Sequence, residues 1–89
     1  MTQPSNTDTM LRSVLSDVLG LNADRTAALD ANSGLFGALP ELDSMAVAGL
    51  LTEIEDRFDI VIDDDEVDGD MLGTYGELLA FVRGKRGDA

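Results

Sequence analysis

Ser44 is the residue of this 89-residue chain whose type and position best suit covalent chemistry. It stands between Leu42-Asp43 and Met45, where a loop turns into a predicted helix. Asp43 is well placed to cap that helix and to put negative charge where the helix dipole favours it. A hydroxyl at a helix N-terminus is open to a modifying enzyme, and the backbone N–H groups there suit an attached anion.

A catalytic serine needs a base within hydrogen-bond reach. The chain contains no His, and its only Lys is Lys85, close to the C-terminus. It also lacks a Gly-x-Ser-x-Gly elbow, the strained turn that exposes the nucleophile of many hydrolases. We therefore expect Ser44 to be a site of modification or a plain helix cap, and the protein not to be an enzyme.

The helix that Ser44 begins is predicted over residues 44–58 and has two distinct faces. One face is apolar at helical spacing, through Val47, Leu50, Leu51, Ile54 and Phe58. The opposite face carries Met45, Ala48, Gly49, Thr52 and Asp56. Ser44 lies at the edge of the apolar face, so its helix has one side to bury and one side to offer to a partner.

The elements before this helix are a first helix and a long connection. The first helix is predicted to be capped by Thr7 or Asp8 and to stop at Gly20. The connection, residues 21–42, has a short helical turn at 24–29, and Leu35, Phe36 and Leu39 are expected to pin it to the core. A connection of this length in a small domain usually serves function or a long crossover.

Two shorter elements follow. The acidic stretch 63–70 is predicted to hold a short third helix with Val67 as its apolar anchor. Thr74 and Glu77 form a Thr-x-x-Glu capping box that starts the last helix, which is predicted to end at Gly84. The sequence thus predicts an all-α four-helix bundle with a long first loop, made of a flexible tail over 1–6, one domain over 7–84 and a flexible tail over 85–89.

Leu42-Asp43-Ser44-Met45 resembles the Asp-Ser-Leu/Met attachment motif of acyl carrier proteins, and the resemblance extends from Leu35 to Val82. It implies the fold of those carriers. It also implies that Ser44 carries 4′-phosphopantetheine, taken from coenzyme A, through a phosphodiester, with Asp43 as a supporting residue of the motif. The thiol of this arm would hold an acyl or aminoacyl group as a thioester.

The resemblance further implies partners and a cargo site. The partners would be a phosphopantetheinyl transferase, an acyl- or aminoacyl-activating ligase and acyltransferases, all with basic docking surfaces. The docking residues would be Glu41, Met45, Ala48, Gly49, Thr52, Glu53, Glu55 and Asp56. The candidates for an acyl pocket are Leu39, Val47, Leu51, Ile54, Ile62 and Leu79. Ala46 and Gly49 stand at positions that are often acidic in the carriers of general fatty-acid synthesis. This variant pattern is similar to that of the carriers of exopolysaccharide and exosortase systems, and the product is expected to be a lipid, a polyketide or an exopolysaccharide.

The composition narrows the function classes. Eighteen acids against six bases give a net charge of −12, which excludes nucleic-acid binding and favours basic partners. Without Cys there is no disulfide, and no run reaches the ~18 apolar residues of a membrane span. We expect a cytoplasmic monomer. The acidic stretch resembles a calcium loop starting at Asp64, but Tyr75 stands at the twelfth position where a Glu is required, so no specific metal site is predicted.

Two alternatives remain open at this level. The Leu-Asp-Ser-Met pattern is also that of D-alanyl carriers and resembles some peptidyl carriers, so the cargo of this chain can be an amino acid. The other alternative is an acidic helical binding module that is never modified.

Overall fold

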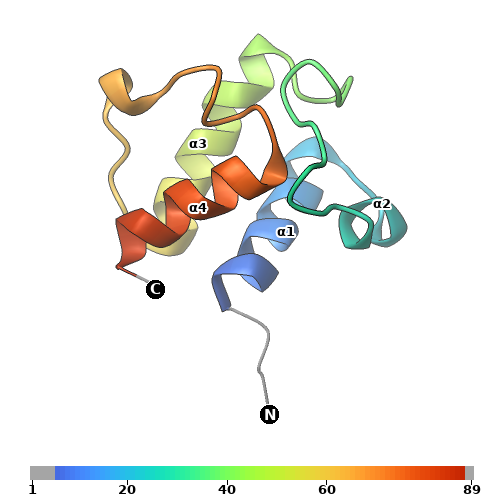
Figure 1. Cartoon of the computed structure of the whole chain (residues 1–89), viewed down its shortest axis with the longest axis horizontal. Helices are drawn as coiled ribbons and strands as arrows, with labels where there is room; N and C mark the ends of the chain where they lie inside the picture. Colours follow the sequence, from blue (N-terminus) through green and yellow to red (C-terminus); the bar gives the residue numbers. More distant parts are fainter. Residues whose placement is uncertain (1–5, 88–89) are drawn as a thin grey trace.

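A computed structural model of the chain describes residues 6–87. In it, α1 is the central helix, against which the other helices pack (Figure 1). The order is α1 (Asn6–Leu19), α2 (Ala23–Ala27), α3 (Ser44–Phe58), the 3-10 turn η1 (Asp64–Glu66) and α4 (Tyr75–Arg86). α2, α3 and α4 all pack against α1. Residues 6–87 form no strand, only an isolated bridge between Gly34 and Thr74, so the predicted all-α fold is confirmed.

The core is aliphatic, with Tyr75 as its largest fully buried side chain. The apolar side chains without any exposed surface come from each long helix and from the long loop. They are Leu11, Val14, Leu15, Leu35, Leu50, Ile54, Leu78 and Val82. Because α1 contributes neighbours on successive turns, it presents one continuous apolar face on which the other helices dock.

The predicted bounds of α3 are confirmed at both ends. Asp43 is extended, as an N-cap residue should be, and Asp59 ends the helix in the left-handed conformation with φ 54°. The backbone N–H of Asp59 donates to the carbonyl of Glu55. The amphipathic pattern is confirmed too, since Leu50, Ile54 and Phe58 are buried and the residues of the opposite face are exposed.

Two helix ends differ from the sequence prediction. α1 begins at Asn6, so Thr7 and Asp8 lie inside its first turn and are not its cap. Thr7 is fully buried there, and its hydroxyl accepts from Arg86 over 3.0 Å. α4 does not end at Gly84 but continues to Arg86, and Gly87 takes the left-handed conformation with φ 77°.

Both predicted short helices are present where the sequence places them, but their lengths differ from the prediction. The acidic stretch holds only the single turn η1, whereas the helical turn expected in the long connection is the regular helix α2, capped by Asn22. Like charges at successive positions disfavour a longer helix over residues 63–70. The predicted tail over residues 1–6 lies outside the described residues apart from Asn6, and the predicted limits of the domain stay a prediction.

The second half of the long loop runs antiparallel to the start of α4 and is held there by backbone hydrogen bonds. The N–H of Phe36 donates to Leu72 over 2.9 Å, and that of Tyr75 donates to Ser33 over 2.8 Å. A Cβ on Gly76 would come within 2.7 Å of the carbonyl oxygen of Ala31, so this close approach requires glycine. Leu35 is buried as expected, but Phe36 is 46% exposed and is not a core residue.

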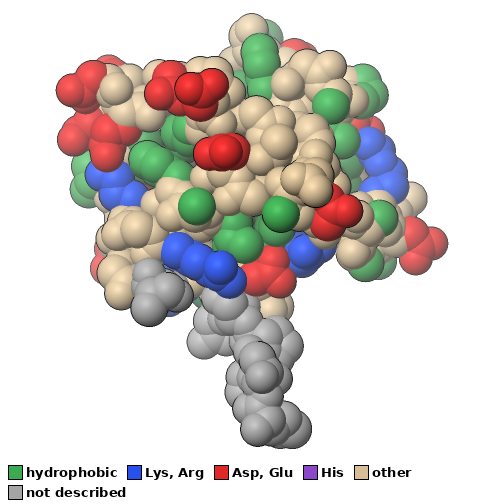
Figure 2. All heavy atoms as spheres, viewed as in Figure 1, with side chains coloured by type: hydrophobic (Ala, Val, Ile, Leu, Met, Phe, Trp, Pro, Cys, Tyr) green, Lys and Arg blue, Asp and Glu red, His purple; other side chains and the backbone are tan. Residues whose placement is uncertain are grey.

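Residues 59–74, which we call the connecting segment, lead from α3 over η1 to α4 and pass along the left and top of Figure 1. Acidic side chains gather at the upper left of the same view, over this segment (Figure 2). Lys85 of α4 pairs with Glu66 over 2.6 Å, so the residue predicted to lie in a flexible tail anchors the segment. No helix within residues 6–87 combines the length and the apolarity that crossing a membrane requires.

Candidate functional site around Ser44

Ser44 is the first residue of α3, and its side chain is exposed. The Asp43 carboxylate accepts a hydrogen bond from the N–H of Ala46 over 2.8 Å, and the Asp43 carbonyl accepts from Val47 over 3.0 Å. These bonds fix the start of the helix on both sides of Ser44. The N–H groups in the first turn of a helix lack intrahelical acceptors, so a phosphate on the Ser44 oxygen would lie at an anion-favouring end.

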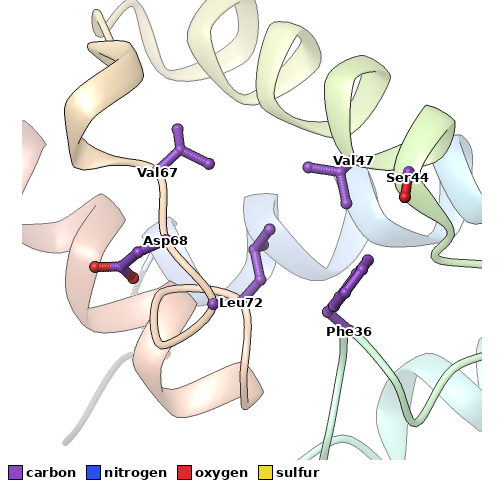
Figure 3. A pocket seen from close by; sticks show the side chains of 7 residues that line it. Phe36, Ser44, Val47, Val67, Asp68 and Leu72 are labelled. Atoms are coloured by element: carbon purple, nitrogen blue, oxygen red, sulfur yellow. The ribbon is translucent and has the colours of Figure 1, made fainter.

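Two hollows border Ser44. The first, which we call the proximal cavity, has a volume of about 240 Å³ and is lined by Phe36, Ser44, Val47, Val67, Asp68, Gly69 and Leu72. In Figure 3, Val47 and Val67 point toward one another across it, while the Asp68 carboxylate is directed away from Ser44. The second, the loop cavity, has a volume of about 440 Å³ and is lined by residues 36–40 and 42–44. An exposed hydroxyl with open space on two sides fits attachment of a long, slender group.

The predicted docking face, made of Glu41 and the open side of α3, lies at the surface, but its acidic side chains differ in how free they are to bind a partner. Met45 is 85% exposed, and Ala48, Gly49, Thr52 and Asp56 are exposed as well. The hydrogen bonds and charge of Arg25 lower the pKa of Glu41 to about 2. Arg57 donates to Glu53 over 2.9 Å, and the N–H of Ile62 donates to Glu55 over 2.8 Å. Thus Asp56 is the freest of the four acids, and the other three also serve the fold.

The acyl-pocket candidates are not brought to one place. Val47 lines the proximal cavity, Leu39 lines the loop cavity, and Leu51 and Ile62 line a further cavity along α3. Ile54 is fully buried in the core, and Leu79 packs half-buried against it. Ile54 and Leu79 are therefore placed as packing residues.

Sequence reasoning missed the residues that close the proximal cavity from the other side. Phe36 was expected in the core, Val67 was expected only as an anchor, and Leu72 was not singled out. Leu72 is buried at the end of an irregular segment, where no periodicity marks the buried side. Its carbonyl accepts from the N–H of Phe36 over 2.9 Å, a pairing between residues far apart in sequence that only the fold reveals.

The carboxylates of the acidic stretch, residues 63–70, are the first place to look for a metal centre. Among the described residues, no group of three or more His, Cys, Asp or Glu side chains is arranged to hold a metal ion. Two of the acids have other partners, since Glu66 pairs with Lys85 and the Asp68 carboxylate accepts from the N–H of Met71 over 2.8 Å.

Known proteins resemble this chain in sequence and in fold. The sequence model of the family described as "Phosphopantetheine attachment site" matches residues 10–82. An acyl carrier protein from an Exiguobacterium species is 37% identical over 43 residues, which are 48% of this chain and 52% of that relative. The match thus spans about half the length of that relative. A solution NMR structure of a holo acyl carrier protein from Nitrosomonas europaea is 41% identical, with a TM-score of 0.83 over 93% of this chain and 99% of that chain.

The chain belongs to the acyl carrier proteins, a family built around a phosphopantetheine attachment site. Its cofactor is therefore a covalently attached phosphopantetheine. Carriers of this family work with a phosphopantetheinyl transferase and with biosynthetic enzymes.

Proposed function

We propose that the Ser44 hydroxyl carries the phosphopantetheine arm and that the protein delivers an acyl group held on it as a thioester. The observation that carries this proposal is the exposed Ser44 side chain at the start of α3, beside two cavities. When bound, the arm supplies the thiol that this cysteine-free chain lacks. The protein acts as a carrier and leaves the chemistry to its partners.

The residues around Ser44 have separate tasks in this proposal. Asp43 holds the first turn of α3, so the serine oxygen is presented at a fixed place. The backbone N–H groups of that turn favour the negative charge of the phosphodiester. Met45, which is 85% exposed directly after Ser44, offers an apolar contact to the enzyme that docks there.

An acyl chain is favoured over an amino acid as the cargo. Val47, Val67 and Leu72 give the proximal cavity apolar walls directly beside Ser44. An apolar chain gains from leaving water there, whereas the ammonium group of an aminoacyl thioester would lose hydration. Loading by adenylating ligases specific for fatty acids or for amino acids tests this choice, and efficient loading with amino acids alone would overturn it.

The partners follow from the charge and from the open face of α3. Basic docking surfaces are attracted by the net charge of −12 and approach faster at low salt. Because Met45, Ala48 and Gly49 make the first half of the open face apolar, we propose a dedicated carrier with its own partner, of the kind found with exopolysaccharide systems. A monomeric state and a cytoplasmic location are part of this proposal.

The decisive experiment is an intact mass measurement after incubation with coenzyme A, magnesium and a broad-specificity phosphopantetheinyl transferase. The proposal predicts a gain of one phosphopantetheine per chain, which disappears in Ser44→Ala. Ser13→Ala is the matched control, because Ser13 is also an exposed helical serine. A gain that persists in Ser44→Ala, or no gain with several transferases, would overturn the proposal.

A further inference from the structure

The further cavity that Leu51 and Ile62 line continues the line of the proximal cavity along α3. This distal cavity has a volume of about 260 Å³ and is lined by Ala48, Leu51, Thr52, Glu55, Ile62, Asp64 and Val67. Val67 lines the proximal cavity as well. Val67 is thus the one residue that lines both cavities.

The lining residues of α3 form a single stripe that begins at Ser44. Val47, Leu51 and Glu55 follow it at intervals of three, four and four residues, which keeps them on one side of a helix. At the rise of an α-helix, the stripe from Ser44 to Glu55 is about 16 Å long. A chain that leaves Ser44 through the proximal cavity is therefore directed toward the distal cavity.

The connecting segment forms the opposite wall and is fixed on both sides of Val67. Before Val67, the N–H of Ile62 donates to Glu55 of α3 over 2.8 Å, and Glu66 pairs with Lys85 of α4 over 2.6 Å. After Val67, the side chains of Met71 and Leu72 are buried. Between these attachments Val67 is only partly buried, and its side chain projects toward Val47 of α3 (Figure 3).

We propose that Val67 is the residue that sets the length of acyl chain this carrier shelters. The inference rests on attachment of the arm at Ser44. With Val67 between them, the two hollows are separate, and a bound acyl chain is sheltered up to the capacity of the proximal cavity. Thr52, Glu55 and Asp64 make the far wall polar, so an apolar chain gains less beyond Val67 than before it.

The size of the Val67 side chain should therefore control how many methylene groups of the acyl chain are sheltered. Val67→Ala joins the two hollows, so longer chains become sheltered. Val67→Phe occupies part of the proximal cavity, so the longest sheltered chain becomes shorter. Each further buried methylene shifts the sheltering equilibrium by about fourfold. Val61→Ala is the matched control, because Val61 belongs to the same segment but is 71% exposed.

The test uses the full-length protein loaded with butanoyl, octanoyl, dodecanoyl and hexadecanoyl thioesters, each confirmed by intact mass. The increase in Tm of each acylated form over the same variant carrying the bare arm measures sheltering, because a chain bound only to the folded state stabilises it. Comparing each variant with its own bare-arm form removes any loss of basal stability. Cleavage by hydroxylamine, which attacks the thioester carbonyl and releases the thiol, is the second readout.

In every protein the increase in Tm should grow with acyl chain length up to a limiting length. We expect this limiting length to be longer in Val67→Ala, and shorter in Val67→Phe, than in the wild type or in Val61→Ala. Cleavage of the longest sheltered thioester should be slower in Val67→Ala by about fourfold or more. Equal limits in all variants, a shift of the same size in Val61→Ala, or no increase at any length would overturn the inference. Absence of the arm in the mass spectrum would instead overturn the proposed function, and the inference with it.

Discussion

The carboxylate of Asp43 accepts a hydrogen bond from the backbone N–H of Ala46 over 2.8 Å, and this bond spans the first residues of the helix that Ser44 begins. The acid next to the proposed attachment site therefore has a structural task that does not depend on its charge.

Two substitutions of Asp43 separate its role as a helix cap from the effect of its negative charge. Asp43→Ala removes the cap and should lower the free energy of unfolding by about 1 kcal/mol, whereas Asp43→Asn keeps an acceptor oxygen and should change it little. Urea denaturation of both variants measures the difference. If Asn is as destabilising as Ala, the capping role assigned to Asp43 is wrong. Should modification by the transferase fall in Asp43→Asn although its stability is kept, the charge of Asp43 serves the transferase as well.

The buried Tyr75 hydroxyl donates to the carboxylate of Asp8, and Arg12 lies 4.8 Å from the centre of the Tyr75 ring. Burial, together with the Asp8 carboxylate, raises the pKa of Tyr75 above its ordinary value of 10.0. The unfolded chain then releases the phenol proton at lower pH than the folded protein does. The stability contributed by neutral Tyr75 is complete below pH 10 and falls as the pH rises from there toward the folded-state pKa.

Tyr75→Phe tests this cluster directly. The variant should lose about 1–2 kcal/mol of stability at neutral pH, because Asp8 loses a hydrogen-bond donor in a partly buried site. Above pH 10 the gap to the wild type should narrow, since Phe does not titrate. Unfolding free energies of both proteins, measured across that range, give the comparison. A gap that stays constant with pH would contradict the assigned pKa shift.

The sequence predicts best where a local rule decides the structure. Asp43 and Thr74 cap helices as predicted because each side chain needs only a backbone N–H three residues on, Ala46 and Glu77 respectively. Apolar spacing gave the buried face of α3 for a similar reason, since helical period alone decides which residues share a side. Ser44 and the helix that it begins could therefore be placed before the fold was known.

The sequence predictions fail where the local structure depends on a residue that is distant in the sequence. Gly84 reads as a helix stop, but α4 continues because Lys85 reaches Glu66 and Arg86 reaches Thr7, and the left-handed turn falls on Gly87 instead. Phe36 and Val67 border the proximal cavity only because the loop and the connecting segment meet α3 there. No spacing rule links these three segments, so the cavity could not be predicted from the sequence.

Met45 offers a test of the docking face. Met45→Glu should reduce kcat/KM of the transferase by about fivefold or more, as expected for loss of a contact worth ~1 kcal/mol. Its effect on folding should stay within about 0.5 kcal/mol, because the side chain is 85% exposed. Val61→Glu introduces the same charge at another exposed apolar residue and is the control. Equal losses in turnover for the two variants, or a gain for Met45→Glu, would show that packing around Met45 does not guide the partner.

The connecting segment predicts a response to divalent cations. Asp63, Asp64 and Asp65 are exposed and adjacent, so their repulsion disfavours the folded state. Millimolar magnesium or calcium should raise the Tm by a few degrees, gradually and without the saturation of a specific site. Sodium chloride at the same ionic strength controls for simple screening. A melting curve that does not move across the titration would contradict this prediction.

The central claim is that the arm is attached to Ser44, and locating the added mass within the chain tests it most directly. Protein modified by a transferase would be digested and its peptides fragmented in a mass spectrometer. We predict that one phosphopantetheine is found and that the fragment ions on either side of Ser44 assign it to that residue. Its assignment to any other hydroxyl, or a peptide containing Ser44 that stays fully unmodified, would contradict the proposed function.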